Sequence, residues 1–161
     1  MSKLIRDVIQ KEKEEQRRFI HYVNLKNLNG TTIPKYKFTD TTDHYDVSMI
    51  SGNTPMVVEI KVRKDKPIEY FLNNGAFLEL KKLEYIQNCI EDIKIKHPGK
   101  YDNLQKYYFN FCSDGIIIYE LGNPWDYNFN WVYLPKNNTN KNNKIWKLVH
   151  SLMYPVEIIK Y

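Results

Sequence analysis

The stretch that decides the fold is Asp46-Val47-Ser48-Met49-Ile50-Ser51-Gly52-Asn53-Thr54-Pro55-Met56-Val57-Val58-Glu59-Ile60-Lys61. Two short apolar runs flank a group of turn formers at residues 51–55, so the sequence predicts a β-hairpin. Side chains alternate between the two faces of a strand. In the second strand we expect one face to pack on the core, and it carries Met56, Val58, Ile60 and Val62. The opposite face carries Val57, Glu59, Lys61 and Arg63.

This second face places a carboxylate beside an amine, next to Asp46 of the first strand. Carboxylates from two neighbouring strands suit Mg²⁺, so Asp46 and Glu59 are candidate ligands, with the Ile60 carbonyl as a third oxygen. Lys61 would project on the same side and orient a water or stabilise developing negative charge. These residue types suffice for metal-assisted hydrolysis of a phosphodiester. Glu-x-Lys is also common on strands by chance, and taken alone it is explained more simply as a charged surface.

Composition places the chain among globular proteins that form one domain. It has 161 residues, of which 42% are apolar and 27% charged, enough to bury a core. The net charge of +5 favours an acidic partner such as nucleic acid, although only weakly.

Nothing in the sequence indicates secretion or a membrane. Cys89 and Cys112 lie far apart without a metal-binding motif, which predicts buried free thiols in a reducing compartment. The N-terminus is charged and unlike a signal peptide, and no apolar run approaches the ~20 residues that span a bilayer. We therefore expect a cytoplasmic protein without membrane contact. The bias toward Asn, Lys, Ile and Tyr is typical of an AT-rich bacterial or phage genome, and a phage protein would act in the host cytoplasm.

Helical periodicity predicts a helix over residues 2–23. Its apolar stripe, followed from Ile5 in steps of three and four, reaches Glu12, Glu15 and then Phe19. Two glutamates thus occupy positions where apolar side chains are expected. Either the middle of this helix is solvated, or a glutamate lies at the edge of a polar site.

The remaining elements alternate between strands and helices. We predict strands over 35–38, 107–112, 116–121, 131–134 and 156–159, helices over 76–96 and 144–153, and a polar loop over 135–143. Asn73 or Asn74 is the expected cap of the long helix. The order is a helix, three strands, a long helix, two strands and an appendage, which predicts an α/β fold with a mixed sheet.

Asp46, the interval of twelve residues and Glu59-Ile60-Lys61, together with this order of elements, resemble the PD-(D/E)XK nuclease superfamily, which includes restriction endonucleases and junction resolvases. The resemblance implies one nuclease-like domain over residues 1–161. Its mixed central sheet would be flanked by helices in an αβββαβ restriction-endonuclease-like core over about 3–121, with a C-terminal appendage over about 122–161. It also implies that Asp46 and Glu59 bind metal and that Lys61 is catalytic.

The same resemblance implies two further site residues. Many members add an acidic residue from the first helix, for which Glu15 is best placed and Glu12 is the reserve. Many also place a Gln or Lys on the helix after the third strand, which matches Lys82, with Lys81 as the alternative. The implied site is therefore catalytic Asp46, Glu59, Lys61, Glu15 and Lys82, and Mg²⁺ (Mn²⁺ as a substitute) held by Asp46, Glu59 and Ile60.

The expected function is a metal-dependent DNA nuclease that hydrolyses phosphodiester bonds. A homodimer fits this expectation, because cutting two strands suits two sites. A non-catalytic nucleic-acid-binding or assembly protein on the same fold is the alternative, and an RNA-directed nuclease also stays open.

Several other residues have both a binding and a structural interpretation. His44 shares the strand face of Asp46, or lies half-exposed in a loop. Arg63, Lys64 and Lys66 extend the basic edge toward DNA phosphates, or form a solvated strand end. Aromatic residues before the polar loop either stack on bases or pack the appendage on the sheet, and they are Trp125, Tyr127 and Trp131. Four lysines would form an electropositive region if that loop folds back, and they are Lys136, Lys141, Lys144 and Lys147.

Overall fold

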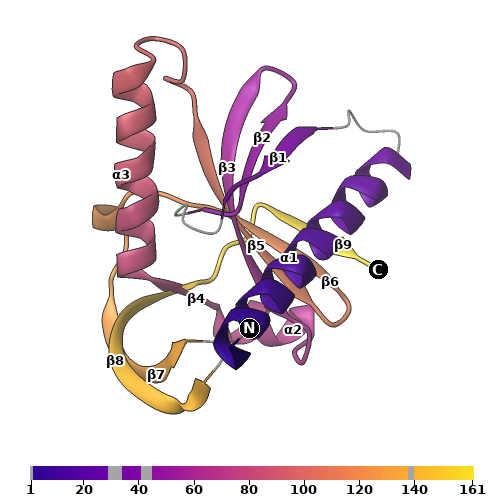
Figure 1. Cartoon of the computed structure of the whole chain (residues 1–161), viewed down its shortest axis with the longest axis vertical. Coiled ribbons are helices and arrows are strands. Elements are labelled where there is room, and N and C mark those ends of the chain that lie inside the picture. Colours follow the sequence, from indigo (N-terminus) through magenta and orange to yellow (C-terminus); the bar gives the residue numbers. More distant parts are fainter. Residues whose placement is uncertain (1, 29–33, 41–44, 138–139) are drawn as a thin grey trace.

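The computed structural model describes residues 2–28, 34–40, 45–137 and 140–161. Its elements in chain order are α1 (Lys3–Leu28), β1 (Lys35–Phe38), β2 (Val47–Ser51), β3 (Thr54–Arg63), α2 (Ile68–Asn74), β4 (Ala76–Glu79), α3 (Leu80–Lys96), β5 (Gln105–Cys112), β6 (Gly115–Glu120), the 3₁₀ turn η1 (Pro124–Asp126), β7 (Asn130–Asn137), β8 (Asn140–Leu152) and β9 (Glu157–Lys160). Figure 1 shows their arrangement. The predicted α/β fold with a mixed sheet is confirmed.

A six-stranded sheet forms the centre, in the order β1-β2-β3-β5-β6-β9. β3 and β5 are parallel, because α3 carries the chain from one to the other, and the other neighbours are antiparallel. The predicted hairpin of β2 and β3 is present, with Ser51 opposite Thr54. Gly52 has a φ of 61° in its turn, a conformation that glycine adopts without steric cost.

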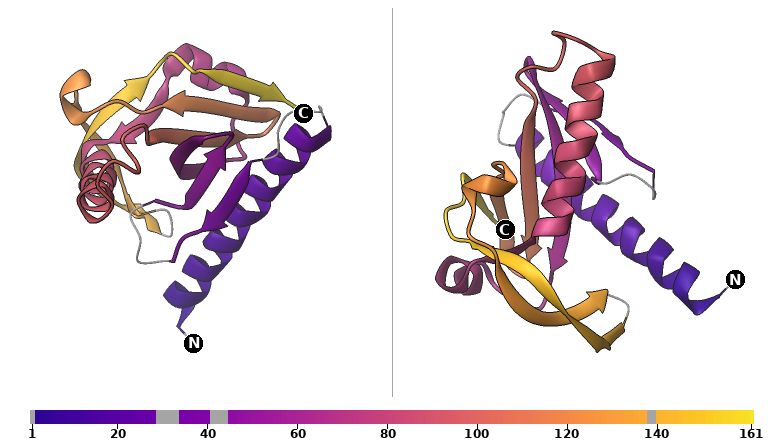
Figure 2. Two further views of the ribbon diagram at one scale, coloured as in Figure 1. Left: turned by 90° about the horizontal axis from the view of Figure 1, so that it is seen from above. Right: turned by 90° about the vertical axis from the view of Figure 1, so that its left-hand side faces the viewer.

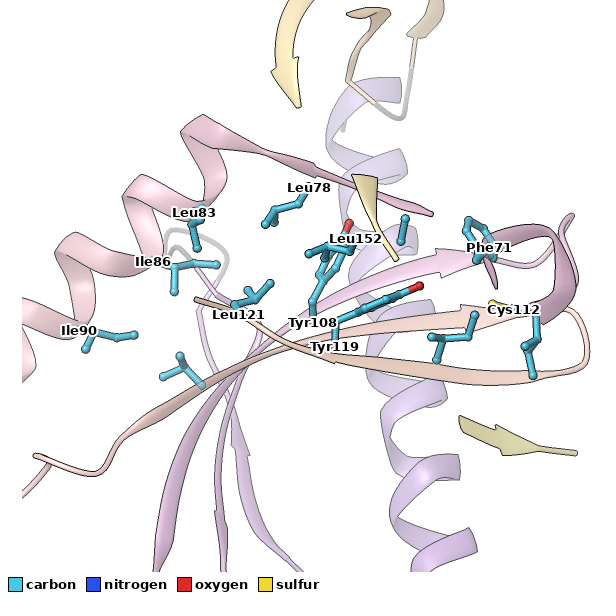
Figure 3. Packing of buried hydrophobic residues seen from close by; sticks show 14 residues of the cluster. Phe71, Leu78, Leu83, Ile86, Ile90, Tyr108, Cys112, Tyr119, Leu121 and Leu152 are labelled. Atoms are coloured by element: carbon cyan, nitrogen blue, oxygen red, sulfur yellow. The ribbon is translucent and has the colours of Figure 1, made fainter. Parts of the chain in front are cut away.

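Helices cover both faces of this sheet (Figure 2, left). On one face α1 packs through Phe19 against Val58 and Ile60 of β3, together with residues of β5 and β6. On the other face α2 and α3 cover a second cluster, which includes Tyr108 and Tyr119 of the sheet (Figure 3). The predicted central strand is confirmed, because Ile116 and Ile117 of β6 are both fully buried, on opposite faces.

The charged face of β3 is less exposed than we predicted. We expected only Met56, Val58, Ile60 and Val62 to face the core, but Val57 is also buried, in the cluster beneath α3. Glu59 lies on that same face and is 3% exposed. The reason is that a strand between two partners is covered on both sides once helices pack on each face.

The helix predicted over 76–96 begins four residues later. Residues 76–79 form β4, which pairs with β8, and α2 precedes it unpredicted. Asn74 ends α2 instead of capping α3, whose N-cap residue is Glu79. Gly75 separates the two elements with a φ of 80°, and a Cβ there would lie 2.7 Å from the Met153 sulfur. Pairing with a distant strand therefore overrides the local helical pattern.

The helix predicted over 144–153 is wrong, because residues 144–152 belong to β8. The spacing of its apolar residues fits a helix. Instead, β8 pairs with β7 between residues 140 and 149 and with β4 over residues 149–152. Val149 and Leu152 are buried against the body of the protein. The region after residue 121 also supplies β9, which joins the main sheet beside β6.

α1 ends at Leu28, five residues beyond the prediction. Cys112 is buried, Cys89 is partly buried, and both are free of disulfides. No helix in the described ranges has the length and apolar character needed to cross a membrane.

Candidate active site

The β2–β3 hairpin holds Asp46 at the entrance of β2, beside the middle of β3. Val47 pairs with Val58, and the Asp46 backbone N–H donates to the Val58 carbonyl at 2.9 Å. The Ile60 N–H donates to Oδ2 of Asp46 at 2.7 Å. One carboxylate oxygen of Asp46 is therefore held by the backbone of the strand that carries Glu59.

Glu59 is buried between two lysines. Its Oε1 lies 3.2 Å from Nζ of Lys82 and 3.8 Å from Nζ of Lys61. Its Oε2 has no hydrogen-bond partner among the described residues. Burial, reinforced by the charge of Asp46, raises the pKa of Glu59 to about 8 although both lysines act to lower it. The buried Oε2 thus keeps its capacity to accept a hydrogen bond or to bind a cation.

Glu15 reaches the same site from α1, on the other face of the sheet. It is buried, and Nζ of Lys11 lies 3.4 Å from its Oε1. Burial and then the charge of Asp46 raise the pKa of Glu15 to about 7, against the lowering effect of Lys11 and Lys61. The glutamate in the apolar stripe is thus at the edge of a polar site, not in a solvated stretch.

Lys82 enters from the first turn of α3. Burial alone would lower the pKa of its amine, but the charges of Glu59 and Asp46 outweigh this effect and raise it. Lys82 therefore places its amine inside the site, beside Glu59. Lys81, the alternative from the sequence, instead places Nζ 5.6 Å from the ring centre of Tyr85.

One pocket of about 200 Å³ brings the predicted residues together, and its lining includes Glu15, Asp46, Glu59, Ile60, Lys61 and Lys82. Glu12, the reserve candidate, lines it as well. Lys11 also lines the pocket and was not predicted from the sequence. It could have been found from its position four residues before Glu15, which is the spacing of an ion pair on a helix.

The other residues singled out in the sequence lie in different environments. His44 lies outside the described residues, as does the side chain of Lys141. Arg63 and Lys64 line a hollow next to Lys61, and Nζ of Lys66 lies 4.7 Å from the ring centre of Tyr70. Among the aromatic candidates, Tyr127 packs against the core and accepts a 2.6 Å hydrogen bond from the Gly122 N–H, whereas Trp125 and Trp131 are exposed.

The donor set fits a magnesium ion with few protein ligands. The described part of the chain contains no cluster of three or more His, Cys, Asp or Glu arranged to hold a metal. Mg²⁺ commonly uses only one or two carboxylates and keeps several waters. Asp46 and the unpaired Oε2 of Glu59 supply such a pair, in a pocket that also carries cations for a phosphate.

Comparison with known proteins gives no match for this chain to a protein-family model, a curated protein or a solved structure. The chemistry of the pocket and the order of the elements are therefore the basis for a function.

Proposed function

We propose that this protein is a Mg²⁺-dependent DNA nuclease of the PD-(D/E)XK type. The observation that carries the proposal is the pocket that gathers Glu15, Asp46, Glu59, Lys61 and Lys82 from two helices and a hairpin. The order α1-β1-β2-β3-α2-β4-α3-β5 supports it further, since it contains the αβββαβ order of the superfamily that the sequence resembles, with α2 and β4 inserted before α3.

In this proposal Asp46, Glu59 and the Ile60 carbonyl hold the metal. A bound Mg²⁺ would supply a water of lowered pKa and would offset negative charge on the phosphorus. The backbone hydrogen bond from Ile60 to Oδ2 of Asp46 orients that carboxylate before any ligand arrives. Such preorganisation reduces the cost of assembling the site.

Lys61 and Lys82 have different roles in this proposal. Lys61 orients the attacking water and stabilises the charge that develops on the phosphate. Lys82, which is paired with Glu59 in the metal-free protein, turns to the scissile phosphate. Glu15 assists from α1, because its charge acts on Lys61 and holds that amine within the pocket.

A cleavage assay tests the proposal. Plasmid, linear and branched DNA are incubated with the purified protein in Mg²⁺, in Mn²⁺ and in chelator. We expect cleavage only with metal, and a loss of about 10²–10³-fold in Asp46→Ala and Lys61→Ala, as for other removed charge-stabilising groups. Lys82→Ala should also reduce cleavage. Lys81→Ala is its matched control and should leave cleavage unchanged, since the Lys81 side chain lies against Tyr85.

Metal-dependent cleavage that persists unchanged in Asp46→Ala and Lys61→Ala would refute the assignment of the site, and absence of cleavage on all three DNAs would refute the activity.

The second candidate, a non-catalytic nucleic-acid-binding protein on this fold, is favoured by the ion pair of Lys82 with Glu59, which satisfies one oxygen of Glu59 without a metal. A thermal melt separates the two candidates, because a ligand of the native state must raise the melting temperature. If the protein is the proposed nuclease, Mg²⁺ should raise its melting temperature, and Asp46→Ala should abolish this rise.

A further inference from the structure

A two-stranded ribbon leaves the body of the protein next to the proposed active site. We call it the arm and define it as β7 together with residues 140–148 of β8. Residues 149–152 of β8 pair with β4 and so anchor the arm, whereas residues 140–148 pair with β7. The arm is the curved ribbon at the lower end of the molecule in Figure 1 and is seen from another side in Figure 2 (right).

One face of the arm carries exposed aromatic rings. Tyr133 lies opposite Trp146, and Trp131 lies opposite Leu148, so alternation puts all three rings on one face. Trp131 is 64% exposed, Tyr133 52% and Trp146 63%. The ring centres of Tyr133 and Trp146 are 5.4 Å apart. Large aromatic groups gathered in solvent indicate a binding surface.

The arm is basic as well as aromatic. Residues 127–156 contain four lysines and no Asp or Glu. Lys136 and Lys144 are exposed, and Lys144, opposite Pro135, shares the face of the rings. Nζ of Lys147, on the other face, is paired with Glu79 at 2.9 Å. A surface with aromatic rings, an exposed amine and no carboxylate of its own is complementary to a polymer of bases and phosphates.

The arm also borders the site. A hollow of about 270 Å³ lies between the two, and its opposite wall includes Lys61 and Lys82, the two lysines of the proposed site. The arm lines it with Leu134 and Lys147, which alternation puts on the face opposite the rings, and with Pro135, which shares the face of the rings. A strand held on the rings would therefore reach the hollow across the edge of the arm at Pro135.

We propose that the arm binds a single-stranded segment of DNA, whose bases stack on Trp131, Tyr133 and Trp146 and whose phosphates contact Lys144. The choice of DNA rests on the proposed function, and the inference narrows its substrate class to DNA with an unpaired stretch, such as an overhang, a flap or a branch. Ring faces in solvent favour unpaired bases, because the bases of a duplex are already stacked on one another.

The other candidate for this face is a second copy of the chain. Two arms packed face to face would bring lysines of like charge together without any carboxylate between them, which is unfavourable. Nucleic acid satisfies both the rings and the amines, so it is the occupant that the arm fits.

A binding experiment with chelator present tests the inference without cleavage. Fluorescence anisotropy measures the binding of a labelled thymidine 20-mer, of a duplex of equal length and of a uridine 20-mer. We expect the thymidine strand to bind more tightly than the duplex, and Trp146→Leu to weaken its binding about tenfold, the usual cost of one lost stacking platform. Trp146→Phe should restore most of the affinity, because it retains a ring.

Trp125→Leu is the matched control, since Trp125 is also exposed, at 75%, but lies in η1 outside the arm. We expect its affinity to stay within about twofold of the unchanged protein. Unchanged binding in Trp146→Leu, preference for the duplex, or equal losses in Trp125→Leu and Trp146→Leu would overturn the inference. Tighter binding of the uridine strand would overturn the choice of DNA.

Two more measurements keep the outcomes distinct. If sedimentation shows a dimer that Trp146→Leu dissociates while DNA binding is intact, the arm is an interface between copies and the inference is wrong. If the arm is needed for DNA binding but no cleavage occurs in Mg²⁺, the proposed nuclease activity is wrong and the proposed DNA-binding role of the arm stands. Cleavage that is unaffected by the arm variants would refute the arm and retain the nuclease.

Discussion

Two hairpins of this protein, β2–β3 and the arm of β7–β8, are both antiparallel strand pairs, but they place their side chains in opposite environments. In the first, the middle of β3 is covered on both faces and carries a buried carboxyl group, with Glu59 between Lys61 and Lys82. The second exposes aromatic rings, with Trp131 and Trp146 in solvent. Buried charge requires partners from the same molecule, whereas exposed aromatic surface calls for a partner from outside. The contrast separates the place of the proposed chemistry from the place of substrate binding.

The buried charge of the first hairpin predicts the largest effect, a dependence of stability on pH. The pKa values of Glu59 and Glu15 are raised from 4.5 to about 8 and about 7, so the folded metal-free protein binds protons that the unfolded chain releases. Their stabilising contribution is complete below pH 4.5 and is lost as the pH rises through 7 and 8. Urea unfolding in chelator should show a free energy that falls from pH 5 to pH 8.5, by on the order of a few kcal/mol.

The matched comparison for this prediction is Glu59→Gln, which cannot ionise and should have a smaller fall over the same range. Asp92→Asn, on the exposed side of α3, should leave the fall unchanged. A fall of equal size in Glu59→Gln would show that Glu59 is not its source.

The difference in burial predicts an intermediate effect, measured by the same deletion in both hairpins. Val58 of β3 is fully buried, and Val58→Ala should cost about 2 kcal/mol of unfolding free energy, the loss of burial plus a cavity. Val132 of the arm is only partly buried, and Val132→Ala should cost less than about 1 kcal/mol. Chemical denaturation at one pH measures both, and equal costs would mean that the arm is packed as tightly as the central sheet.

The exposed charge of the arm predicts the smallest effect. Lys144→Ala should lower the dependence of log affinity for single-stranded DNA on log salt concentration by about one phosphate contact, a change of about 0.7 in slope. Lys100→Ala, an exposed lysine beyond the end of α3, is the control and should keep the slope. A slope that is equal in all three proteins would exclude Lys144 from phosphate contact.

Much of the candidate site could be predicted because its signals are local. Asp46 and Glu59 lie on strands joined by a short turn, so alternation and pairing alone bring them side by side. Glu15 was detectable as a carboxylate in an apolar stripe. Its burial, and the choice of Lys82 over Lys81, depend on how α1 and α3 rotate against the sheet, which no local pattern specifies.

The arm is the region where local patterns misled. Residues 144–153 have apolar side chains at helical spacing, but this segment pairs with β7 and β4 instead. A short apolar run fits either element, and strand partners distant in the chain decide between them. The same pairing converts residues 76–79 from the predicted first turn of a helix into β4.

The sequence by itself determined the α/β class, the first hairpin and the residue types of its polar face, because these follow from turn chemistry and from periodicities within a few residues. Only the tertiary structure decided that Glu59 is buried, that Glu15 and Lys82 meet it in one pocket, and that the arm is a ribbon with its rings in solvent. The physical reason is that burial and strand pairing depend on contacts between distant segments, whose energies exceed the local preferences of each segment.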